Sequence, residues 1–340
     1  MRSLLDKIIR SSRLVLAGGM VVALSGCAMI WKSTGDILVT FGEAEMAPYL
    51  FTYDDIRMGC MTGEAQTPLL MSFAEVGSWP EKLGVLTYTT AAACVEQQAL
   101  EEELRYHREV RAGNVASAQD ARIAQKRLSA VAAKRLYKAY TIMNEKFGPI
   151  EEGQCPYLRK DLDELVWLVG NISGVQALVA DGAADGTVGV PRDIVAKVER
   201  RMKCLDNEKW WGAPMGVRAT IWSILPQLAP EGAEPWKVLH ESEQMGFEQG
   251  VRLGSAFYAM SAYSKGDNER LRDAIRNFAA NDDNVDPEYR MMDTIAGVLV
   301  TGLSDRLWTE NTGKRTPIGA LGTFWDDEAD EPEVDIDDLL

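Results

Sequence analysis

Histidine is scarce in this sequence, and its scarcity argues against several kinds of catalytic and metal site. Only two histidines, His107 and His240, occur among 340 residues. The stretch HESEQ at 240–244 begins as an H-E-x-x-H zinc motif does, but Gln244 stands where the second histidine ligand belongs. His107 lies in a charged stretch, and no G-x-S-x-G serine motif is present. We therefore expect no metal, no cofactor and no enzymatic activity.

A long hydrophobic run is also missing near the N-terminus. The apolar stretch Leu14–Leu24 has 11 residues, whereas a helix needs about 20 to cross the hydrocarbon core of a membrane. Four basic residues precede it: Arg2, Lys7, Arg10 and Arg13. A basic segment, a short apolar segment and small residues at its end are typical of a secretory signal peptide.

Cys27 distinguishes this segment from an ordinary secretory signal peptide. It follows Ser25-Gly26, with Leu24 three residues before it, and this stretch resembles the lipobox of bacterial lipoproteins. The resemblance implies that a signal peptide of residues 1–26 is removed and that lipid is attached to Cys27. Ala28, rather than aspartate, follows and implies sorting to the outer membrane, on its periplasmic side. The alternatives are an ordinary secretory signal with a chance cysteine, or a signal-anchor helix.

The other four cysteines predict two disulfides. They are Cys60, Cys94, Cys155 and Cys204, and an even number in an oxidising compartment favours disulfide bonds. Their spacing is too wide for a C-x-x-C redox or zinc motif. Three pairings exist, and the helix prediction below favours Cys60–Cys94 with Cys155–Cys204, because each pair joins helices that are adjacent in sequence.

The charge of the chain is strongly acidic. The formal net charge is −15, and loss of the signal peptide, with four basic residues and one acidic residue, leaves −18 on the mature chain. Nine acids lie between Asp326 and Asp338. Such a balance argues against nucleic acid as a partner. We expect residues 326–340 to form a disordered, solvated tail, with a docking peptide as the alternative.

Strand patterns are scarce, and helical periodicity runs through most of the sequence. We predict an all-α domain over residues 27–325, with about ten helices arranged in antiparallel hairpins as an irregular solenoid. Two long helices should meet at Gly113-Asn114, which would bring Glu101–Glu103 opposite Gln125–Arg127. Residues 234–267 read as one long helix.

A late segment, 256–289, has the outline of a tetratricopeptide unit. It contains a helix, a turn at Gly266-Asp267 and a second helix. Leu271 and Phe278 stand where that repeat has small alanines. We therefore predict a tetratricopeptide-like hairpin rather than a regular repeat.

Aromatic residues supply the candidate ligand site. Tryptophan suits an amphipathic pocket because it is apolar and carries one hydrogen-bond donor. The candidate pocket residues are Trp210, Trp211, Trp222 and Tyr263. The turn WWGAPMG is the preferred wall, because adjacent tryptophans cannot share one face of a helix. The alternative is that these side chains form a solid core.

A lipobox, an all-helical array, a tetratricopeptide-like hairpin and no catalytic motif together resemble the T component (TatT-like) of tetratricopeptide-associated TRAP transporters. These are helical periplasmic lipoproteins. The resemblance implies a periplasmic solute-binding protein as partner and a cavity suited to an apolar ligand. It is one of architecture, and no binding residue is carried over from it.

We therefore expect a non-enzymatic accessory component of a transport system, attached to the membrane by its lipid. A helical lipoprotein of another periplasmic lipid-trafficking system, for example for sterols or hopanoids, is a related expectation. The competing prediction is a scaffold or envelope-assembly lipoprotein with a solid core that binds only other proteins. Self-association into a homo-oligomer is compatible with either role.

Overall fold

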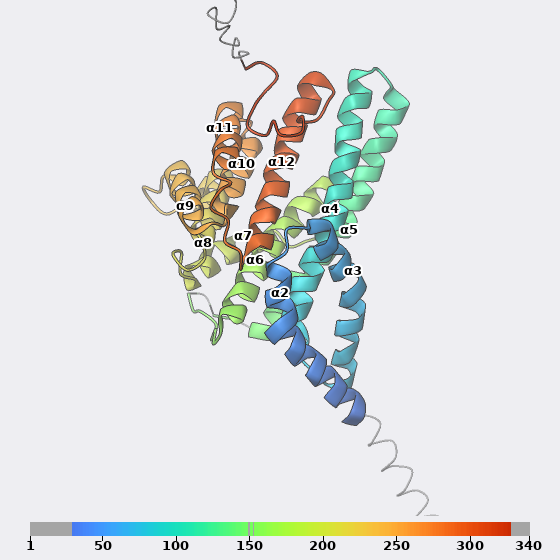
Figure 1. Ribbon diagram of the computed structural model, residues 1–340, viewed down its shortest axis with the longest axis vertical. Helices are drawn as coiled ribbons and strands as arrows, with labels where there is room; N and C mark the ends of the chain where they lie inside the picture. Colours follow the sequence, from blue (N-terminus) through green and yellow to red (C-terminus); the bar gives the residue numbers. More distant parts are fainter. Residues whose placement is uncertain (1–28, 149, 152, 328–340) are drawn as a thin grey trace, which may run out of the picture. The chain divides into compact units, whose positions relative to one another are not determined.

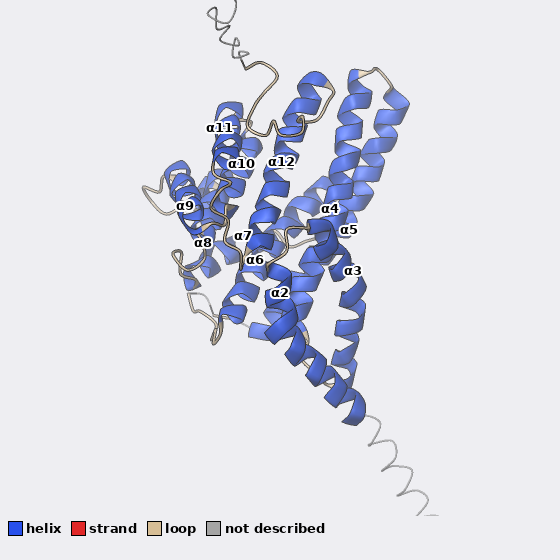
Figure 2. Cartoon of the chain, viewed as in Figure 1, coloured by secondary structure: helices blue, strands red, loops and turns tan. Residues whose placement is uncertain are grey.

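The computed structural model describes residues 29–148, 150–151 and 153–327, and helices make up most of this part of the chain (Figures 1 and 2). It contains no strand there, which confirms the all-α prediction. The predicted signal peptide and Cys27 lie outside the described residues. The labelled helices are α2 (Ala47–Phe51), α3 (Ile56–Ser72), α4 (Glu81–Arg111), α5 (Val115–Phe147), α6 (Asp161–Ala183), α7 (Ile194–Arg201), α8 (Ala213–Ile224), α9 (Pro235–Gln249), α10 (Leu253–Lys265), α11 (Asn268–Ala280) and α12 (Arg290–Thr312).

These helices divide between two compact units. Unit 1 consists of residues up to 98, 126–206 and 287–291, and unit 2 consists of residues 99–125, 207–286 and 292 onwards. Unit 1 opens with the N-terminal helix, residues 29–51, which includes a π-helical turn and α2. The described part of the predicted helical domain therefore comprises two compact units.

The core of unit 1 forms where α5 and α6 approach closely. Gly170 of α6 lies against Met143 of α5, and Gly174 lies against Tyr140, so the absent side chains let the two backbones come together. Trp167 is fully buried and meets the ring of Phe147 edge to face. Although α6 is long and apolar enough to cross a membrane, most of it is buried inside the protein. It is therefore a core helix of unit 1.

The predicted hairpin between the two long helices is confirmed. Gly113 has a φ of 76°, a left-handed conformation that glycine adopts at little cost, and it connects α4 to α5. Glu101 and Glu103 do not form ion pairs with the segment Gln125–Arg127 that was expected opposite them. The carboxylate of Glu103 instead accepts two hydrogen bonds from Arg306 of α12, at 3.0 and 2.9 Å, and Glu101 pairs with Arg315. The partners of these two acids are therefore Arg306 of α12 and Arg315, which follows α12, while Arg105 and Asp120 pair across the hairpin at 3.1 Å.

Unit 2 contains the predicted tetratricopeptide-like hairpin, α10 and α11. Gly266 turns the chain, and the Asp267 side chain accepts a hydrogen bond from the Arg270 amide to cap α11. The single helix predicted over 234–267 is wrong, because it breaks into α9 and α10 at Gly250. This glycine has a φ of 78°, and its carbonyl accepts a hydrogen bond from the Asp286 amide at 2.9 Å. A later segment of the chain therefore stabilises the break.

Candidate functional site

The cysteines are paired in the arrangement favoured by the sequence. Cys60 of α3 is bonded to Cys94 of α4, and Cys155 is bonded to Cys204, with the Cα atoms 5.4 Å apart in each pair. Gly63, one turn after Cys60, lies against the backbone of α4. Both disulfides belong to unit 1. Their role is therefore to hold neighbouring segments of one unit together.

Trp210 and Trp211 lie in the turn that leads into α8. Their rings meet edge to face, with centroids 5.3 Å apart. Trp211 has a φ of 53° and Gly212 a φ of 72°, so two consecutive residues are left-handed and reverse the chain sharply. Both side chains consequently point into the core, with 1% and 3% of their surface exposed. The predicted turn is present, and it buries both rings.

The packing around α8 depends on small residues. Ser242 of α9 donates a hydrogen bond from Oγ to the Gly212 carbonyl at 2.8 Å. A Cβ atom added to Gly216 would lie 2.5 Å from the same Oγ, and one added to Gly254 would overlap the Ser242 carbonyl. Three helices, α8, α9 and α10, therefore meet at close to backbone contact. Trp222 of α8 is 6% exposed, so it too is a core residue of this region.

Tyr263, the fourth predicted pocket residue, lies in a different environment. It is 39% exposed, and the guanidinium of Arg306 lies 5.7 Å from the centre of its ring. Partial burial raises the pKa of the Tyr263 hydroxyl. The structure thus buries the three tryptophans at the two ends of α8 and places Tyr263 beside the Arg306–Glu103 ion pair.

Glu243, inside the HESEQ stretch, is a buried acid that sequence reasoning missed. Its Oε2 atom lies 3.3 Å from Nδ1 of His240 and accepts a hydrogen bond from the Asn277 amide at 3.4 Å. Burial raises the pKa of Glu243. Its spacing from the buried residues Leu239 and Gly246 is helical, so the apolar stripe of α9 could have revealed it. Within the described residues, no group of three His, Cys, Asp or Glu side chains is placed to hold a metal.

A second buried charge, Arg252, links three elements of unit 2. Its guanidinium donates to both carboxylate oxygens of Asp293, at 2.8 and 2.6 Å, and to the Phe278 carbonyl at 3.0 Å. The group also lies over the Phe278 ring, 4.0 Å from its centre. A bidentate pair with its remaining donors satisfied is a structural link rather than a reactive site. Sequence patterns did not reveal it, because its partners lie far along the chain.

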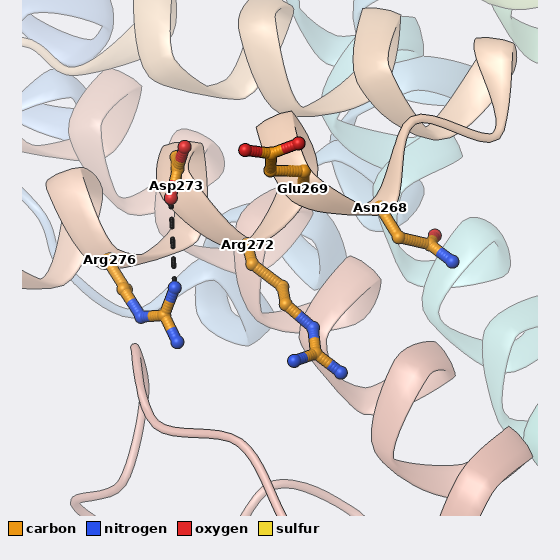
Figure 3. Close-up of a pocket in the computed structure, with 5 residues that line it drawn as sticks. All are labelled: Asn268, Glu269, Arg272, Asp273 and Arg276. Carbon is orange, nitrogen blue, oxygen red and sulfur yellow. Dashed lines mark ion pairs between the residues drawn. The ribbon is translucent and has the colours of Figure 1, made fainter. Parts of the chain in front are cut away.

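An open depression on the surface of unit 2 is lined by polar side chains from α11 (Figure 3). They are Asn268, Glu269, Arg272, Asp273 and Arg276. Arg276 lies 3.7 Å from Asp273 and 2.7 Å from Asp327, and Arg272 lies 2.9 Å from Asp326. The first two acids of the predicted tail are therefore bound to α11, and residues 328–340 lie outside the described part. This lining suits charged groups of a partner better than an apolar molecule.

Comparisons with protein-family models, curated proteins and solved structures find no match to this chain. A functional conclusion consequently depends on the residues and on the geometry described above.

Proposed function

We propose that the chain is a non-enzymatic lipoprotein of the outer membrane that faces the periplasm and binds a partner protein there. The packing around α8 carries this proposal. The three predicted pocket tryptophans are at most 6% exposed, and Gly212, Gly216 and Gly254 bring three helices into close contact. Ligand pockets for small molecules have volumes of roughly 300–1,000 Å³. A core packed so closely favours a protein-binding scaffold over a carrier of an apolar ligand.

The partner that we propose is a periplasmic solute-binding protein, which would make the chain an accessory component of a transport system. Support comes from the α10–α11 hairpin, which has the outline of a tetratricopeptide unit, a module of helical binding arrays. The polar depression on α11 offers charges of both signs to such a partner.

Two mass-spectrometric measurements on the protein extracted from membranes test the anchor and the solid core. A tryptic digest tests the anchor, and native mass spectrometry of the intact protein tests the core. Trypsin should release the peptide Cys27–Lys32 with acyl chains attached, and the variant Cys27→Ser should lack them. The intact protein should carry only this covalent lipid. A non-covalently bound apolar molecule at one copy per chain would overturn the scaffold proposal, and an unmodified Cys27 would overturn the anchor.

A photo-crosslinking amino acid tests the partner. Placed at Glu269 on the α11 depression, it should yield one discrete protein adduct in intact cells. Placed at Val179, an exposed position on α6, it should yield none. Equal adducts from both positions, or none from either, would contradict a docking role for α11.

A further inference from the structure

The N-terminal helix has an exposed apolar face distinct from the face that packs on the rest of unit 1. Gly35 lies against Phe73 and Ser78, and Gly42 lies against Leu83. A second face is polar and includes Lys32 and Asp36, which pair at 2.7 Å. The exposed apolar residues at helical spacing on the third face are Ile30, Ile37 and Phe41, with 63%, 68% and 56% of their surface exposed. Three large apolar side chains on one solvent-facing side of a helix are typical of an interaction surface.

More apolar side chains gather at the end of unit 1 where this helix begins. The N-terminal helix and α3 converge there, at the lower end of the view in Figure 1. Ser78 donates a hydrogen bond to the Lys32 carbonyl at 3.2 Å. Trp31 and Trp79 flank this bond in sequence, and they are 58% and 67% exposed. Two exposed tryptophans at one end of a unit are typical of a surface at a membrane interface, because the indole ring is apolar with one polar atom.

We infer that this surface, formed by Ile30, Trp31, Ile37, Phe41 and Trp79, lies in the lipid interface of the membrane. The inference rests on the proposed anchor. Trp31 is only four residues after Cys27, so even a fully extended chain would separate them by at most about 14 Å. Acyl chains on Cys27 would therefore hold this face against the headgroups. The five side chains that form it are uncharged, so they can enter the interface without desolvating a charge of their own.

Vesicle binding without the lipid anchor tests this surface directly. The mature chain from residue 27, carrying Cys27→Ser and secreted so that both disulfides form, is mixed with neutral vesicles of phosphatidylethanolamine and phosphatidylcholine. We expect measurable flotation with the vesicles. Adding Ile37→Glu and Phe41→Glu should weaken binding at least tenfold. The control Val179→Glu places one glutamate at an exposed apolar position of α6, so it is compared with Ile37→Glu alone, and it should change binding less than twofold.

Fluorescence quenching in the acylated protein supplies a second measurement. In vesicles that contain brominated phosphatidylcholine, Trp31 and Trp79 should be quenched. The variant Trp79→Phe should reduce the quenched fraction, whereas Trp236→Phe, at a half-buried position in unit 2, should leave it unchanged.

The outcomes separate this inference from the proposed anchor. If Cys27 is acylated but the lipid-free chain does not bind vesicles and Trp79 is not quenched, the surface serves a protein partner and the inference is overturned. If the lipid-free chain binds and the glutamate variants do not, while Cys27 is unmodified, the surface stands and the anchor falls. Equal binding by the parent chain and the double glutamate variant would also overturn the inference.

Discussion

The carboxyl group of Glu96 should make the free energy of unfolding depend on pH. Glu96 of α4 is half-buried, and burial raises its pKa from 4.5 to about 7. Between these values the unfolded chain has released a proton that the folded chain still holds. The free energy of unfolding therefore falls as pH rises from about 4.5 to 7. Glu96→Gln removes this titration, so the variant should gain about 1–3 kcal/mol over the parent at pH 8 and nothing at pH 4.

Urea denaturation at both pH values measures this difference. Glu45→Gln is the matched control, because it removes one negative charge from an exposed position of the same unit. The control should follow the parent at both pH values. Parallel stability curves for Glu96→Gln and the parent would show that burial of this carboxyl does not control the pH dependence.

At the residue scale, the sequence predicted the features that depend on the spacing and order of residues along the chain. The absence of a zinc pair from HESEQ follows from Gln244 alone, and the favoured disulfide pairs follow from the order of the helices. The conformation of Trp211 could not be predicted, because a left-handed φ at a tryptophan is stabilised only by the surrounding core. Arg252 and Asp293 are 41 residues apart, so their pairing depends on the tertiary fold.

At the scale of the helices, glycine has opposite effects according to what it faces. Gly254, near the start of α10, leaves room for the Ser242 carbonyl of α9. Gly254→Ala should therefore destabilise the protein by about 1–3 kcal/mol through overpacking, despite the higher helix propensity of alanine. Gly182 of α6 has open space around it, and Gly182→Ala should be neutral or stabilise by up to about 1 kcal/mol.

Equilibrium unfolding in urea, followed by circular dichroism, compares the two variants. A loss of stability in Gly182→Ala equal to that in Gly254→Ala would mean that the substitution acts through the backbone rather than through the crossing of α9 and α10. Retained stability in Gly254→Ala would mean that the helices can move apart, and it would weaken the case for a solid core.

The ends of helices were predicted well where local residues mark them. They were predicted poorly where contacts with distant segments of the chain fix them. Gly113 and the Gly266-Asp267 turn both reverse the chain where they were expected to. The break at Gly250 was missed because both flanking segments have good helical periodicity. Its stabilising contact comes from Asp286, 36 residues later, which no local pattern contains.

At the scale of the whole chain, both disulfides belong to one of two units. The bonds Cys60–Cys94 and Cys155–Cys204 close segments of 34 and 49 residues in unit 1. By chain entropy, each such bond should stabilise the folded state by about 3–4 kcal/mol. Reduction should therefore speed amide hydrogen exchange in α3, α6 and α7, while exchange in α9, α10 and α11 should change little.

Hydrogen exchange before and after reduction, followed by mass spectrometry, measures this asymmetry. The double variant Cys60→Ser with Cys94→Ser should show part of the increase, because one bond remains. The helices α4 and α5 contribute residues to both units, so they offer a route by which opening of one unit could spread to the other. Equal increases in both units would mean that these shared helices couple the two units into one cooperative structure. An increase confined to unit 1 would instead leave unit 2, with its α11 depression, folded under conditions that open the unit beside the proposed anchor.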